Sequence, residues 1–237
     1  MYLRSFAFIR VFFFILIVNA PSLDTYAIVR HMGVQDYAST LEKMQQFNAE
    51  RTAETPDEIW LLEHPAVFTL GTNGKEEHLL NPQNIPVIQS DRGGQVTYHG
   101  PGQLVAYVLL DVKRKKMGVR NLVNALERTV IRFLSRHGIE ATADPKAPGV
   151  YVNGEKIAAL GLRVKQGGCY HGLSLNVDMD LTVFDRINPC GYPDMKVTSL
   201  KQLGVSLSMQ QVEFRLLKEL CMQLNILNIT EMKEATS

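Results

Sequence analysis

The chain has 237 residues and carries 25 Lys and Arg against 24 Asp and Glu, so its formal net charge is +1. This balance argues against a protein that binds nucleic acid by bulk phosphate neutralisation, and we expect no nucleic-acid partner. Apolar residues make up 46% of the chain, which is ordinary for a globular protein with room for one large or two small domains.

The start of the chain is apolar and resembles an export signal. Residues 1–10 are a basic flank, and Val11–Val18 are an uninterrupted apolar run. That run of about eight residues is well short of the roughly 20 that a membrane-spanning helix needs. We interpret residues 1–24 as a disordered or upstream-start extension first, an export signal second and a membrane anchor last. We therefore expect a single folded domain over residues 25–237, a cytoplasmic location and no membrane association.

Cysteine occurs three times, at Cys169, Cys190 and Cys221, without a CxxC pair or metal-ligand spacing. A disulfide framework and a zinc site are therefore both disfavoured, and we expect no metal. Free thiols in a chain of this size suit a reducing compartment.

The first half of the chain alternates between strand and helix patterns. The sequence predicts a strand at 26–30, a helix at 35–48, a strand at 58–62 and an extended segment at 63–71. A loop with a helical turn follows at 71–84, and the apolar run Gln103–Asp111 predicts a buried central strand.

The second half adds a long helix and two hairpins. A broad apolar stripe over 119–137, closed by Gly138, is typical of a helix packed on a sheet. Segments 149–152 and 156–164 flank the turn Asn153-Gly154 as a hairpin, and a second hairpin is expected at 166–168. A strand at 173–177, a turn at 181–184 and a helix at 210–224 complete an α+β domain with a mixed β-sheet flanked by helices.

One basic run, Lys113-Arg114-Lys115-Lys116, interrupts an otherwise neutral stretch. It is either a solvated loop or a docking site for an acidic carrier protein, and both interpretations stay open at this point.

Three segments carry candidate chemistry. Asp91–Gln103 interleaves glycine and proline with polar side chains, which lets main chain come close to a ligand. Lys156 follows a hairpin turn and heads an apolar strand, while Cys190 lies between Pro189 and Gly191 in a loop with little side-chain bulk. An ammonium beside a thiol stabilises the thiolate, so the two residues, if they meet, form an activated nucleophile.

The histidines offer weaker candidates. His99 ends the glycine-rich motif and could position substrate or transfer a proton. Cys169 and His171 invite a thiol–imidazole pair, but residues i and i+2 of a strand share a face without a catalytic hydrogen bond. We expect His64, His78 and His137 to be loop or helix-end residues.

Four blocks in this order and spacing, RGGQVTYHGPGQ, GEKIAALGLRV, HGLSLNV and INPCG, resemble the lipoyl(octanoyl) transferase family over roughly residues 28–199. The resemblance implies the fold of the biotin and lipoate protein ligase catalytic domains. It also implies octanoyl or lipoyl transfer from acyl carrier protein to a lysine of a lipoyl domain, the first step of endogenous lipoate synthesis, without cofactor. The implied acceptors are lipoyl domains of 2-oxoacid dehydrogenase complexes and the glycine cleavage H protein.

The resemblance also assigns roles to residues. Cys190 would carry the acyl group as a thioester, and Lys156 would lower the pKa of its thiol and act in acid–base steps. The substrate pocket would be lined by three blocks: Arg92, Gly93, Gly94, Gln95, Val96, Thr97, Tyr98 and His99; Ala159, Leu160 and Gly161; and Gly172, Leu173 and Ser174.

Two other functions remain open. An ATP-dependent lipoate or biotin protein ligase on the same fold would activate a free acid and would not need Cys190. A non-catalytic lipoyl-domain binding protein would keep the pocket without turnover.

Overall fold

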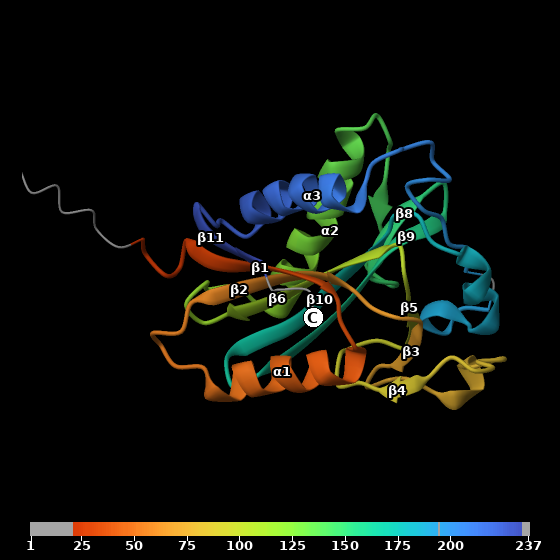
Figure 1. The fold of residues 1–237 in the computed structure, drawn as a ribbon, viewed down its shortest axis with the longest axis horizontal. Helices are drawn as coiled ribbons and strands as arrows, with labels where there is room; N and C mark the ends of the chain where they lie inside the picture. The colour runs from red at the N-terminus through yellow and green to blue at the C-terminus, as the bar shows by residue number, and fades with distance from the viewer. Residues whose placement is uncertain (1–20, 194, 234–237) are drawn as a thin grey trace, which may run out of the picture.

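The computed structural model describes residues 21–193 and 195–233, and of Cys190 it describes the main chain alone. The described residues form three layers, with a large sheet between helices (Figure 1). Helix α1 (Tyr37–Glu50) covers one face, and helices α2 (Val119–Ser135) and α3 (Met209–Gln223) cover the other. Most of the apolar extension lies outside the described residues.

The large sheet has eight strands in the described part of the chain. Strand β11 pairs in parallel with β1, and β1 with β2, while every later pair is antiparallel. The predicted mixed sheet flanked by helices is therefore confirmed. The strand order is β11 (Asn228–Lys233), β1 (Tyr26–Val34), β2 (Asp57–Glu63), β6 (Gln103–Asp111), β10 (Gly168–Asn176), β9 (Glu155–Lys165), β8 (Gly149–Val152) and β7 (Thr142–Ala143).

A small second sheet lies beside the large one. Its order is β4 (Val87–Gln89), β3 (Val67–Leu70) and β5 (Val96–His99). Three short 3₁₀ helices, η1 (Glu76–His78), η2 (Leu181–Arg186) and η3 (Pro189–Gly191), connect the strands near this sheet. The glycine-rich motif thus contains a strand of its own, β5. From the sequence, the motif was expected only to lie at the edge of a strand.

Burial explains why the central elements were predictable. Strand β6 is buried at every residue except Asp111, as an unbroken apolar run in a covered sheet requires. Helix α2 buries Leu122, Leu126 and Val130 against the sheet and begins at the predicted residue. Strand β11, in contrast, is exposed along its whole length and was not predicted.

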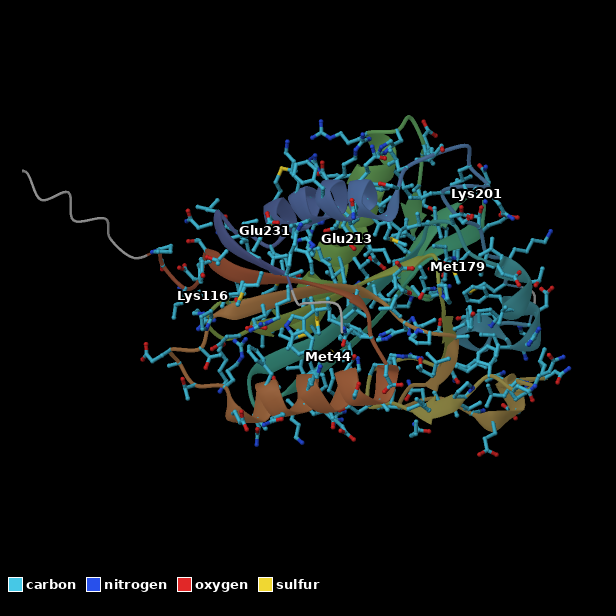
Figure 2. All side chains as sticks on the ribbon, viewed as in Figure 1. Met44, Lys116, Met179, Lys201, Glu213 and Glu231 are labelled. Atoms are coloured by element: carbon cyan, nitrogen blue, oxygen red, sulfur yellow. The ribbon has the colours of Figure 1, made fainter. Side chains whose placement is uncertain are left out.

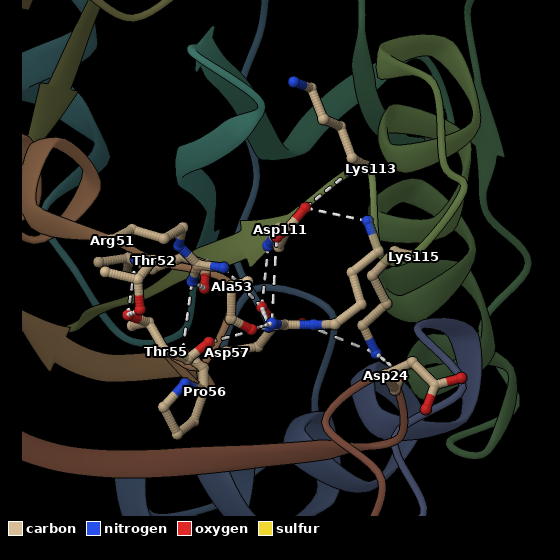
Figure 3. Close-up of polar contacts among 12 residues, drawn as sticks. Asp24, Arg51, Thr52, Ala53, Thr55, Pro56, Asp57, Asp111, Lys113 and Lys115 are labelled. Atoms are coloured by element: carbon tan, nitrogen blue, oxygen red, sulfur yellow. Dashed lines mark hydrogen bonds and ion pairs between the residues drawn. The ribbon is translucent and has the colours of Figure 1, made fainter.

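The basic run Lys113–Lys116 is built around a buried carboxylate. Asp57 is fully buried, and its Oδ1 accepts hydrogen bonds from Arg51 (2.9 Å) and Arg114 (2.7 Å). The Lys115 ammonium lies 3.9 Å from Asp57 Oδ2 and donates to the carbonyl of Asp24 (Figure 3). Its side chain is only 4% exposed. Arg114 and Lys115 are therefore parts of an internal ion-pair network, and Lys115 is not free to dock a carrier protein.

The position of this run also separates it from the glycine-rich motif. Lys116 lies toward one end of the long axis of the molecule, and Met179 lies toward the other (Figure 2). Met179 packs with the small sheet, and its sulfur is 3.8 Å from Gln103 Nε2, at the end of the glycine-rich motif. The basic run and the Gln103 end of the glycine-rich motif therefore lie toward opposite ends of the molecule.

Among the described residues, no helix combines the length and apolar character needed to span a bilayer.

Candidate active site

The glycine-rich segment is held in shape by a buried arginine. Arg92 is 7% exposed, and its guanidinium donates to both the hydroxyl and the carbonyl of Thr69 and to the carbonyls of Gly93 and Gln95. The Gly93 N–H in turn donates to the Leu162 carbonyl (2.9 Å), which fastens the segment to β9. These bonds satisfy carbonyls of an irregular segment that would otherwise be buried without partners.

We expect Arg92→Ala to lower the free energy of unfolding by roughly 3 kcal/mol, because the acceptors on Thr69, Gly93 and Gln95 lose a charged donor. Urea denaturation followed by circular dichroism measures the change. Arg120→Ala is the matched control, since Arg120 is exposed at the start of α2 and should change stability by less than about 0.5 kcal/mol. Equal stability of the two variants would contradict the structural role of Arg92.

The end of the motif fixes the tautomer of His99. Asn176 donates to the Thr198 carbonyl, so its amide oxygen accepts from Gln103 Nε2 (3.0 Å), and Gln103 Oε1 is left to accept from His99 Nδ1 (2.7 Å). His99 is then a neutral imidazole with Nε2 as an acceptor. Burial lowers its pKa well below the usual value, and the nearby His64 and Arg92 add to the effect.

A tight turn makes this arrangement possible. Gly102 has φ +82°, and a Cβ there would lie 1.8 Å from the Asp178 carbonyl oxygen. The Gly102 carbonyl accepts from the N–H groups of Val177 and Asp178. No other residue fits this turn.

A narrow cavity of about 50 Å³ opens between the motif and the sheet. It is lined by Tyr37, Arg92, Gly94, Gln95, Val96, Thr97, His99, Val105, Tyr107, Ala159, Leu160, Gly161, His171, Gly172, Leu173 and Ser174. Because the resemblance described above predicts that it receives the acyl group, we call it the acyl pocket. Three strands of the large sheet, β6, β10 and β9, form one wall, and the glycine-rich segment forms the other.

The structure brings most of the expected pocket residues together. All of them line the acyl pocket except Gly93 and Tyr98. Gly93 bonds to β9 through its main chain, and Tyr98 packs on the other side of β5 against Phe68 and Phe184. Substrate binding by the lining residues remains a prediction.

Lys156 is buried near the start of β9, the strand whose Ala159, Leu160 and Gly161 line the pocket. Its side chain is 3% exposed, with Nζ 3.3 Å from the Pro148 carbonyl oxygen and 5.1 Å from the centre of the Tyr151 ring. A Cβ on Gly149 would lie 2.8 Å from Lys156 Cε, so the glycine makes room for the lysine. Glu127, on α2, accepts the Gly149 N–H (3.1 Å), and burial raises the pKa of its carboxyl although the Lys156 ammonium opposes this.

The segment 196–198, which follows Cys190 in the sequence, is bound to the main chain of Lys156. The Lys156 N–H donates to the Lys196 carbonyl (2.8 Å), and the Lys156 carbonyl accepts from Thr198 (3.0 Å). Helix η3, which contains Cys190, lies against the glycine-rich segment, since a Cβ on Gly191 would be 3.5 Å from Gln95 Cγ. The Cys190 side chain lies outside the described part of the structure, so its contact with Lys156 remains a prediction.

The other two cysteines lack the surroundings of a nucleophile. Burial raises the pKa of the Cys169 thiol to about 12 and that of Cys221 to about 11. Cys169 packs in the core beneath α2 and α3, whereas His171 lies on the opposite side of the sheet, by Tyr107. The thiol–imidazole pair that their spacing suggested is not formed.

His64 lies in the loop between β2 and β3, as expected, but its side chain is buried. It is fully buried, its Nδ1–H donates to the Gln35 carbonyl (2.7 Å), and its Nε2 accepts from the Tyr107 hydroxyl (2.8 Å). It therefore supports the wall of the acyl pocket instead of occupying a solvated loop. Four residues that were not expected from the sequence also line the pocket, namely Tyr37, Val105, Tyr107 and His171.

Burial lowers the pKa of His64 to about 4 and so favours its neutral form in the folded state. The unfolded chain binds a proton at His64 below about pH 6.5, so this contribution to stability is present above that pH and declines toward pH 4, by about 3 kcal/mol in all. Urea denaturation of wild type and His64→Gln at pH 7.5 and pH 4.5 tests this. The wild type should lose more stability than the variant on acidification, and equal losses would contradict the assignment.

The described residues contain no group of three or more His, Cys, Asp or Glu side chains arranged to hold a metal ion.

Comparison with known families and proteins identifies the chain by sequence. The model of the lipoyl protein ligase A/B catalytic domain matches residues 36–221. An octanoyltransferase from Marinomonas sp. is 58% identical over 197 residues, which cover 83% of this chain and 92% of the relative. An octanoyltransferase from Chromobacterium violaceum is 56% identical and is covered to 93% of its length.

Solved structures support the fold. A lipoate-protein ligase A bound with ATP superimposes with a TM-score of 0.74, at 14% identity, over 89% of this chain and 90% of that one. A biotin protein ligase from Aquifex aeolicus gives a TM-score of 0.50 over 84% of this chain and 68% of that one. At this identity the likeness concerns the fold alone, whereas the sequence matches extend over most of both chains. The chain therefore belongs to the octanoyltransferase family, within the group that shares the lipoyl protein ligase A/B catalytic domain.

Proposed function

We propose that the protein transfers an octanoyl or lipoyl group from acyl carrier protein to a lysine of a lipoyl domain, through a thioester on Cys190. The relatives named octanoyltransferase, at 56–58% identity, support the acyl group and the transferase activity. The observation that carries the mechanism is the buried Lys156, which lies on a strand that forms part of the wall of a narrow pocket and is bound through its main chain to the segment that follows Cys190.

The proposed reaction has two steps. The Cys190 thiolate attacks the carbonyl carbon of the donor thioester, and the carrier thiol leaves with a proton, which leaves the acyl group on Cys190. The neutral amine of the acceptor lysine then attacks the same carbon, loses a proton and displaces the thiolate as the amide forms. The second step is downhill and the first is close to balanced, so neither needs ATP.

Residues of the pocket have distinct roles in this proposal. Lys156 stabilises the Cys190 thiolate and supplies or removes a proton as the thiol leaves or attacks. Main-chain N–H groups of the glycine-rich segment and of β9 and β10 are candidate donors to the developing oxyanion. The apolar part of the lining, with Val105, Leu160 and Leu173, contacts the acyl chain.

The acceptors we propose are lipoyl domains of 2-oxoacid dehydrogenase complexes and the glycine cleavage H protein, and the location is the cytoplasm. Within the basic run, Arg114 and Lys115 are bound to Asp57 and do not contribute to the carrier interface in this proposal.

The test is intact-protein mass spectrometry after mixing the protein with octanoyl-acyl carrier protein in the absence of ATP. We expect an octanoyl adduct that hydroxylamine removes. Activity that requires ATP and free octanoate, without an adduct, would assign the protein to the ligases instead. Binding of lipoyl domains without any transfer would assign it to the non-catalytic binding proteins.

A further inference from the structure

The end of the acyl pocket away from Lys156 holds a histidine with an unusual backbone. His171, on β10, has φ +64°, a left-handed conformation that is uncommon for residues other than glycine. Its ring stacks on that of the preceding Tyr170, with centroids 5.1 Å apart, and both side chains bind Asp91. The strained backbone thus turns two consecutive side chains of one strand to the same side, where alternation would have separated them.

Asp91 fixes the orientation of this imidazole. His171 Nε2 is 2.8 Å from Asp91 Oδ1, and Asp91 Oδ2 accepts from the Tyr170 hydroxyl and from Gln45 Nε2. Burial opposes ionisation of Asp91, but the bonds from His171 and Tyr170 outweigh it and hold the pKa at about 2. The carboxylate can only accept, so in neutral His171 the proton is on Nε2 and Nδ1 carries a lone pair.

The other nitrogen has no partner among the residues that the structure describes. His171 is 1% exposed, it lines the acyl pocket, and its Nδ1 makes no hydrogen bond there. An apolar chain end pressed against this atom would exclude water from it without replacing the hydrogen bond, which is unfavourable. The ring is therefore both a steric barrier and a polar surface at this end of the pocket.

The distance between the two ends of the pocket suits a medium-length chain. Gly149, which packs on Lys156, pairs with Ala159 of β9, whereas His171 pairs with Leu162. Three residues of strand span about 10 Å. An extended eight-carbon chain, with bonds of about 1.5 Å, spans about 9 Å.

Beyond this end lies a second space. Asp91 and Tyr170 also line an open groove together with Gln45 and Lys165, on the outer surface beside α1. The pair formed by His171 and Asp91 thus stands between the acyl pocket and that groove.

We propose that His171, oriented by Asp91, is the end wall of the acyl pocket and limits the acyl chain to about eight carbons. A longer chain has to displace an imidazole held by a charged hydrogen bond and a strained main chain. Removing the ring takes away this wall and leaves room at this end of the pocket for a longer chain. This inference rests on the proposed function for the identity of the donor.

The test compares chain-length preference in three proteins. Wild type, His171→Gly and Tyr170→Phe are mixed with octanoyl-, decanoyl- and dodecanoyl-acyl carrier protein, and the rate of adduct formation is followed by intact mass. Glycine accepts φ +64° without strain, so this variant removes the ring and keeps the backbone. Tyr170→Phe is the matched control, because it removes one hydrogen bond to Asp91 and leaves the wall in place.

We expect His171→Gly to raise the ratio of dodecanoyl to octanoyl rates roughly tenfold or more, and Tyr170→Phe to leave the ratio within about twofold of wild type. His171→Asn, which also tolerates positive φ, should give an intermediate ratio and serves if the glycine variant does not fold. An equal fall in all three rates, with the ratio unchanged, would reduce His171 to a structural residue and overturn the proposal.

The outcome is separable from that of the proposed function. Absence of any octanoyl adduct on wild type contradicts the thioester route. In that case calorimetry with free octanoate and dodecanoate decides the question of the wall, because it needs no transfer. If wild type and His171→Gly then show the same ratio of dodecanoate to octanoate affinity in calorimetry, the proposal that His171 is the end wall is overturned.

Discussion

Cys190→Ser is expected to form no hydroxylamine-labile octanoyl adduct and to lower the rate of octanoyl transfer to a lipoyl domain by roughly four orders of magnitude. Among single substitutions this one should have the largest effect on activity and a small effect on stability. The measurement is intact mass after exposure to octanoyl-acyl carrier protein, together with the transfer rate under the same conditions.

The reason is the difference between a thiol and a hydroxyl at neutral pH. An ordinary cysteine, with a pKa near 8.5, is already a few per cent thiolate, and a neighbouring ammonium increases that fraction. A serine hydroxyl does not ionise in this range, so Lys156 has no anion to stabilise. The acyl group then remains on the carrier.

The two other cysteines provide the controls. Cys221→Ser and Cys169→Ser should keep the adduct, because burial raises the pKa of both thiols to about 11 and about 12 and leaves them protonated. Loss of the adduct in Cys221→Ser, or its persistence in Cys190→Ser, would move the nucleophile away from Cys190.

Local patterns were enough to predict most of the fold. Strand β6 buries a continuous run of apolar residues, and helix α2 buries an apolar stripe, both of which are visible in the sequence. Both elements begin at the predicted residue. Strand β11 was missed because all of its residues are exposed, so no alternation of apolar and polar side chains marks it. Its main-chain bonds to β1 depend on where the chain returns after α3, which no local pattern encodes.

The site was predictable where it is built from motif residues. Gln95, Thr97 and Ala159 line the pocket through segments that are continuous in the sequence. The contribution of His64 and Tyr107 to the pocket wall was missed because these two residues bond to each other and lie far apart in the sequence. His64 does lie in a loop, but its burial depends on a distant partner and not on a local pattern.

His171 was misjudged for a different reason. Side chains alternate between the faces of a sheet only where the backbone is extended. At His171 the φ of +64° turns the side chain to the face opposite Cys169. The signal that could have pointed to this is the adjoining Gly172, whose Cβ would lie 2.0 Å from the Ala106 carbonyl oxygen. Such close contact between strands accompanies irregular backbone.

Lys156→Ala is expected to slow adduct formation at pH 7 by roughly 10- to 30-fold, because an opposite charge beside a thiol lowers its pKa by roughly one to three units and an unassisted thiol is only a few per cent thiolate at this pH. The difference in rate between wild type and variant should shrink as the pH rises past about 8.5, because an ordinary thiol ionises there without a neighbouring ammonium. A loss that is the same at every pH would instead indicate that Lys156 only positions the loop.

Alkylation of Cys190 by iodoacetamide as a function of pH measures the thiolate directly and requires no donor. The midpoint for Lys156→Ala should lie above that of wild type. Lys196→Ala is the matched control, since Lys196 is exposed and contacts Lys156 through its carbonyl, which the substitution leaves in place. Its midpoint should equal that of wild type.

Stability has to be measured alongside reactivity. Truncating a side chain that is 3% exposed leaves a cavity against Gly149 and Tyr151, so the melting temperature of Lys156→Ala should fall as well. Lys156→Met fills most of that volume without the charge. If Lys156→Met restores the melting temperature and keeps the raised alkylation midpoint, the ammonium acts on the thiol through its charge; if the midpoint returns to that of wild type, packing alone explains the effect.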